Sequence, residues 1–63
     1  MPAKPDEIPL EQRQVIFKAL VEAQDGGKGV AVSRTEIAKH FSVTEDQVKD
    51  IERDGLANQW PPL

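Results

Sequence analysis

Few side chains in this 63-residue chain could do chemistry. His40 is the only histidine and there is no cysteine, so the usual zinc ligands are missing. Ser33 and Ser42 have no evident base and orienting acid, and both have structural explanations. The eleven carboxylates supply acid pairs by number, but so small a core leaves little concave surface to desolvate them. The sequence therefore predicts no catalytic residue, metal, cofactor or small-molecule substrate, and no enzyme.

The charge balance limits the classes of partner that the chain can bind. Eight lysine and arginine residues stand against eleven aspartate and glutamate residues, giving a net charge of −3. Non-specific affinity for nucleic acid comes mainly from surplus basic side chains, which this chain lacks. No apolar run is long enough for a membrane span or a signal-peptide core, and we expect a cytoplasmic protein.

The first element expected to position surface residues is a helix over residues 9–24. Pro9 suits the first turn of a helix, and Asp25-Gly26-Gly27 suits its end. Residues 1–7 contain two prolines and three charged residues and are expected to form a flexible arm, leaving 8–63 as a single domain. The apolar face of this first helix comprises Leu10, Ile16, Phe17, Leu20, Val21 and Ala23.

Two capping boxes in series mark the starts of two further helices. Ser33-x-x-Glu36 predicts a helix over about 34–41, and Thr44-x-x-Gln47 predicts one over about 45–55, which can continue to Asn58. A valine before each cap, Val32 or Val43, has an apolar partner in the following turn.

A short helix, a turn of about three residues and a longer helix are typical of a helix-turn-helix. The expected buried positions are Ile37, Ala38 and Phe41 in the second helix, Val43 in the turn, and Val48, Ile51 and Leu56 in the third. The fold class predicted is all-α, a three-helix bundle with a helix-turn-helix and an extended C-terminal tail, because Pro61 disfavours helical geometry at Trp60.

Residues 35–52, Thr-Glu-Ile-Ala-Lys-His-Phe-Ser-Val-Thr-Glu-Asp-Gln-Val-Lys-Asp-Ile-Glu, resemble the fourth conserved region of sigma-70-type bacterial transcription initiation factors. Residues 9–16, Pro-Leu-Glu-Gln-Arg-Gln-Val-Ile, are similar to the opening helix of the same region. The resemblance covers about residues 9–56. It implies a DNA-binding, transcription-related protein whose third helix enters the major groove.

If this helix enters the groove, Gln47 pairs with adenine and Asp46 accepts from a cytosine amino group. Lys49 and Arg53 reach guanine or phosphate, while Arg34 and Lys39 lie toward the phosphate backbone. The residues expected to contact nucleic acid are Arg34, Lys39, Thr44, Asp46, Gln47, Lys49 and Arg53.

The alternative is a protein-interaction module that keeps the scaffold without binding DNA. From Arg34 to Asp54 there are four basic and six acidic residues, and Glu45 and Asp50 stand where the sigma pattern has arginine and glutamine. The acidic third helix of this module then binds a basic surface of RNA polymerase or another transcription protein, whereas the DNA-binding module is expected to act with a partner or as a homodimer. The expected binding residues of the protein-interaction module are Glu45, Asp46, Asp50, Trp60 and Leu63.

The tail, residues 60–63, also has two interpretations. In the first interpretation, Trp60 and Leu63 fold back over the seam between the first and third helices, because so small a domain needs every large side chain in its core. Alternatively, the apolar, proline-containing tail is exposed and docks into a partner or a second copy of the chain.

Overall fold

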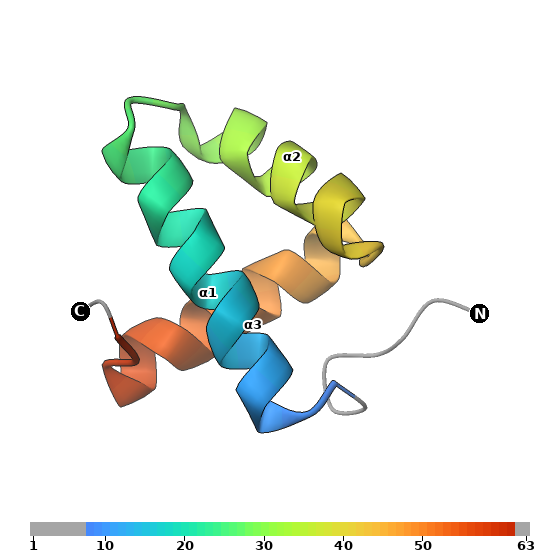
Figure 1. Ribbon diagram of the computed structural model, residues 1–63, viewed down its shortest axis with the longest axis vertical. Helices are drawn as coiled ribbons and strands as arrows, with labels where there is room; N and C mark the ends of the chain where they lie inside the picture. Colours follow the sequence, from blue (N-terminus) through green and yellow to red (C-terminus); the bar gives the residue numbers. More distant parts are fainter. Residues whose placement is uncertain (1–7, 62–63) are drawn as a thin grey trace.

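The computed structural model describes residues 8–61, which form three helices and no strand. Helix α1 spans Leu10–Asp25, α2 spans Val30–Phe41 and α3 spans Glu45–Asn58. Each helix packs against the other two, and α3 crosses α1 (Figure 1). The all-α, three-helix prediction is confirmed. The arm predicted over 1–7 and the expected role of Leu63 lie outside the described residues.

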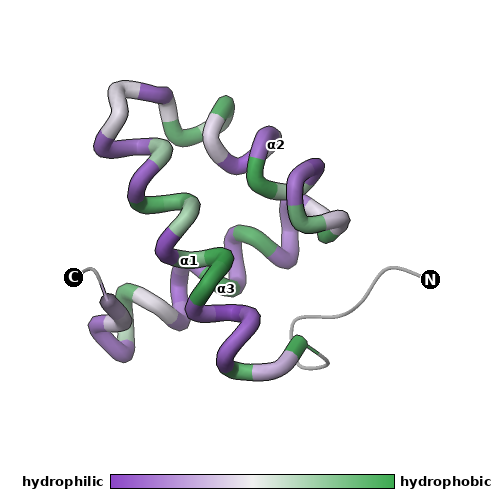
Figure 2. Tube along the Cα trace, in the orientation of Figure 1, coloured by the Kyte–Doolittle hydropathy of each residue, from purple (hydrophilic) through white to green (hydrophobic). Residues whose placement is uncertain are grey.

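The core draws side chains from all three helices and from the segments that flank them. Hydrophobic and hydrophilic stretches alternate along each helix (Figure 2), as expected for elements buried on one face only. Two leucines expected in the core are largely exposed, Leu10 at 52% and Leu56 at 57%. The buried apolar residues are Ile8, Ile16, Phe17, Leu20, Ile37, Ala38, Val48, Ile51 and Trp60.

A glycine explains why Leu56 lies outside. Gly55 is buried in α3, at its contact with α1. A Cβ atom at Gly55 would overlap the ring of Phe17 and lie 2.6 Å from its Cγ. The missing side chain therefore lets the fully buried Phe17 ring lie against the α3 backbone, and the next residue, Leu56, is rotated away from the core.

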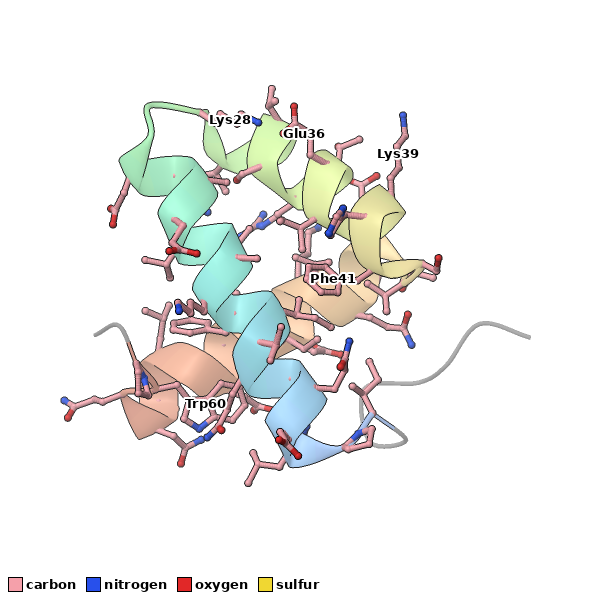
Figure 3. The ribbon with its side chains drawn as sticks, viewed as in Figure 1. Lys28, Glu36, Lys39, Phe41 and Trp60 are labelled. Carbon is pink, nitrogen blue, oxygen red and sulfur yellow. The ribbon has the colours of Figure 1, made fainter. Side chains whose placement is uncertain are left out.

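The chain folds back after α3, as one of the two interpretations of the tail predicts. Gln59 takes a left-handed conformation with φ of 51°, and the Trp60 N–H then donates to the Gly55 carbonyl oxygen at 2.9 Å. The Trp60 ring meets Phe17 edge to face, with ring centroids 5.9 Å apart. Trp60 is 8% exposed and lies by α1 and the end of α3 (Figure 3).

The start predicted for α2 is wrong by four residues. The helix begins at Val30 after Gly29, and Ser33 lies within it instead of capping it. The Ser33 hydroxyl is fully buried, donates to the Val30 carbonyl oxygen at 2.9 Å and lies 3.3 Å from the Gln24 side-chain nitrogen of α1. Because both partners satisfy the hydroxyl inside the bundle, the helix extends past the residue that sequence alone marks as its cap.

The start predicted for α3 is confirmed. The Gln47 N–H donates to the Thr44 hydroxyl at 3.0 Å, and the Thr44 N–H donates to the Gln47 side-chain oxygen at 2.8 Å. Ahead of the cap, Ser42 has a left-handed backbone with φ of 57°, which ends α2 and turns the chain. The turn between the two helices therefore comprises residues 42–44.

Replacing Thr44 by alanine is expected to destabilise the domain by about 1 kcal/mol, because the hydroxyl that caps α3 is lost. Urea denaturation followed by circular dichroism measures the change. Thr44→Ser keeps the acceptor and serves as the matched control. An unchanged denaturation midpoint for Thr44→Ala would contradict the capping box.

Candidate interaction surface on helix α3

Four charged residues lie along the side of α3 that faces away from the core. We call them the outer ridge: Asp46, Lys49, Asp50 and Arg53. Their spacing of three and four residues places them in one stripe, because such residues are neighbours on a helix surface. The buried side of α3 is formed by other positions, Gln47, Val48, Ile51 and Gly55.

The ridge is solvated and only weakly tied to the rest of the domain. Arg53 donates to the Asp50 carboxylate at 2.8 Å, but its side chain is 77% exposed. An exposed pair of this kind is worth about 0.5 kcal/mol or less, so its charges stay available to a partner. Asp46 and Lys49 form no ion pair within residues 8–61.

Arg34, expected near a DNA backbone, is instead bound to α3. Its Nη2 and Nε donate to one oxygen of Glu52 at 2.6 and 3.1 Å, and the side chains of Arg34 and Glu52 are 27% and 18% exposed. Beside this pair, the Thr35 hydroxyl donates to the Ala31 carbonyl oxygen within α2 at 3.0 Å and lies 3.3 Å from a Glu45 carboxylate oxygen. The two Arg34 bonds join α2 to α3 and leave the Arg34 charge largely neutralised.

The other residues expected to contact nucleic acid are dispersed. Gln47 is 4% exposed and Thr44 bonds with it in the capping box, so neither presents a free polar group along the ridge. Lys39 is exposed near the end of α2 and points outward (Figure 3). Of the seven residues, only Asp46, Lys49 and Arg53 lie together on the outer ridge.

Leu56 belongs to this surface, although the sequence predicted it to be a core residue of the third helix. It lines a shallow depression together with Lys49, Arg53 and the Arg34–Glu52 pair. The signal that could have found it was Gly55, because a glycine can mark the position where two helices cross closely, and the residue that follows such a position is rotated away from the contact.

Two further ion pairs lie away from the ridge. Arg13 of α1 donates to Asp54 of α3 at 3.3 Å, and Lys28, in the loop before α2, pairs with Glu36 (Figure 3). Four of the seven basic side chains in residues 8–61 are thus paired with carboxylates, namely Arg13, Lys28, Arg34 and Arg53. Lys18, Lys39 and Lys49 are the lysines of residues 8–61 that form no ion pair there.

No helix within residues 8–61 is long and apolar enough to cross a membrane. Comparisons of the chain with protein families, with curated proteins and with solved structures gave no match.

Proposed function

We propose that the protein is a small helix-turn-helix module that binds another protein through the outer ridge of α3. The observation that carries this proposal is the mixture of signs along the ridge, where Asp46 and Asp50 alternate with Lys49 and Arg53. The backbone of duplex DNA presents negative charge only, and acidic side chains on the approaching helix are repelled by it. A protein surface can present both signs in a complementary order.

The distribution of the remaining charges supports the same conclusion. Glu45 and Asp46 both lie in the first turn of α3, the end that a recognition helix directs toward base edges. Arg34, which would hold the phosphate backbone, already has a carboxylate partner in Glu52. Lys39 is left as an exposed cation on α2, and one lysine supplies little of the phosphate neutralisation that drives DNA binding.

The helix-turn-helix assignment rests on the segment from α2 to α3. A left-handed Ser42 and a turn over residues 42–44 join two helices that pack on each other and on α1. The resemblance to sigma factor region four makes transcription proteins, including RNA polymerase, the first class of partner to test. Such a partner would present basic side chains to Asp46 and Asp50 and acidic ones to Lys49 and Arg53.

Duplex DNA is the second candidate partner. It is favoured by the same two-helix arrangement and by the exposure of Lys39, Lys49 and Arg53, whose long side chains can reach phosphates. In this alternative Asp46 accepts a hydrogen bond from a cytosine amino group, because it is exposed in the first turn of α3.

Titrating the isotopically labelled chain with two probes separates the candidates. The probes are a mixed-sequence duplex of about 20 base pairs and a helical peptide on which arginine and glutamate alternate at the spacing of the ridge, each at low and moderate salt. We expect the peptide to shift the amide resonances of residues 45–53 and the duplex to leave them unchanged. The matched variants are Asp46→Asn, which should weaken peptide binding, and Glu22→Gln on α1, which should not.

Two results would contradict the proposal. The first is a set of duplex-induced shifts on residues 45–53 that fade as salt is raised, which is the behaviour of groove binding. The second is a set of peptide-induced shifts of equal size around Glu11 and Glu22 on α1. Such shifts would mean that the peptide binds acidic side chains anywhere on the chain and does not recognise the ridge.

A further inference from the structure

The order of charges on the outer ridge has a symmetry of its own. From the N-terminal end the ridge reads acid, base, acid, base: Asp46, Lys49, Asp50, Arg53. The same ridge read in the opposite direction is base, acid, base, acid. An antiparallel copy of α3 therefore presents an opposite charge to each of the four residues.

We propose that the outer ridge binds the outer ridge of a second copy of this chain, antiparallel, about a two-fold axis between Lys49 and Asp50. In this register Asp46 lies opposite Arg53 of the second copy, and Lys49 lies opposite Asp50 of the second copy. A two-fold axis repeats both pairs, so the ridge forms four ion pairs. This inference rests on the proposed function and names the partner of the same surface.

Helix geometry allows this contact. Residues three and four apart form a ridge along a helix, and two antiparallel helices pack when the ridge of one lies in the groove beside the ridge of the other. Asp46 and Lys49 have no ion-pair partner within residues 8–61, and the Arg53–Asp50 pair is exposed enough to rearrange. No charge of the ridge has to leave a buried site before the copies meet.

An apolar group lies at each end of the contact. Leu56, at 57% exposure, is one turn beyond Arg53, so the same register places it beside the 42–44 turn of the second copy. Burial of the Leu56 side chain in this contact lowers the free energy of association by an amount that does not depend on salt. The ion pairs set register and direction, while each exposed pair adds little affinity. The dimer is therefore weak and sensitive to salt.

The association is measured by sedimentation velocity over a range of chain concentrations, at low salt and at about 0.5 M salt, where screening is strong. We expect the mean mass to rise from monomer toward dimer with concentration at low salt, and to fall back when salt is added. Monomer at every concentration at low salt would overturn the inference.

Charge reversals test the register. Asp46→Arg and Arg53→Asp each place like charges opposite one another at both ends, so each should weaken self-association about tenfold or more. An equimolar mixture of these two variants should associate again, because one chain then carries two bases where the other carries two acids. The double variant Asp46→Arg/Arg53→Asp should also self-associate. Failure of the mixture to exceed either variant alone would overturn the register.

The matched controls make the same changes in net charge on α1. Glu22→Arg and Lys18→Asp lie on exposed positions outside the ridge and should leave the association constant within about twofold of the parent chain. Circular dichroism checks that each variant is folded. If the parent chain binds the mixed-charge peptide at residues 45–53 but stays monomeric, the proposed function stands and this inference fails; if it does neither, both fail.

Discussion

Gly55→Leu is expected to unfold the domain or bring it close to unfolding. Even a Cβ atom at this position would overlap the fully buried ring of Phe17, and leucine adds three more carbon atoms. Overpacking of this kind costs about 3 kcal/mol or more where neighbours cannot move. A domain of this size has only about 3–5 kcal/mol of stability, so the loss removes most of it. Urea denaturation followed by circular dichroism measures the effect.

The control places the same side chain on the same helix without the clash. Ala57→Leu lies on an exposed position of α3 and should change the free energy of unfolding by less than about 0.5 kcal/mol. A double-mutant cycle with Gly55→Ala and Phe17→Leu adds a second test. Because a smaller side chain at Phe17 relieves the overlap, the two changes together should cost less than their sum. An additive result would contradict a direct contact.

Trp60→Ala is expected to cost about 3–5 kcal/mol, the range found when a large aromatic side chain is removed from a core. Trp60 is 8% exposed and packs edge to face on Phe17, so its removal opens a cavity at the seam between α1 and α3. The loss is comparable to the whole stability expected of a chain of this length. Thermal unfolding followed by circular dichroism measures it.

Trp60→Phe is the matched variant. It keeps an aromatic ring against Phe17 and should recover more than half of the stability that Trp60→Ala loses. A small effect of Trp60→Ala would mean that the ring is not part of the core. The exposed-tail interpretation of residues 60–63 would then be favoured, and partner binding by this segment would be the next property to measure.

The elements that sequence predicted well are those with local causes. The start of α3 depends on Thr44 and Gln47, which bond to each other across three residues of chain. The start of α2 could not be predicted in this way. Ser33 has the same capping pattern, but its hydroxyl lies inside the bundle within hydrogen-bond distance of Gln24, a residue of another helix. A capping motif specifies what a hydroxyl can do, while the bundle decides whether that hydroxyl is at a helix end or inside.

The candidate surface also has a part that the sequence predicts and a part that it does not. The spacing of Asp46, Lys49, Asp50 and Arg53 is enough to place them on one face of any helix that includes them. The neutralisation of Arg34 by Glu52 is not readable from spacing, because the two residues are 18 positions apart and meet only when α2 packs on α3. Sequence therefore gives the ridge, and the packing of the helices decides which charges remain available on it.

The edge-to-face contact of Trp60 with Phe17 also gives the protein an intrinsic optical probe. Trp60 is the only tryptophan of the chain, so its emission reports the α1–α3 seam with no label. Circular dichroism reports the helices themselves, including α2, which contributes no tryptophan. Coincidence of the two signals during denaturation would mean that helix formation and closure of the bundle are one cooperative event.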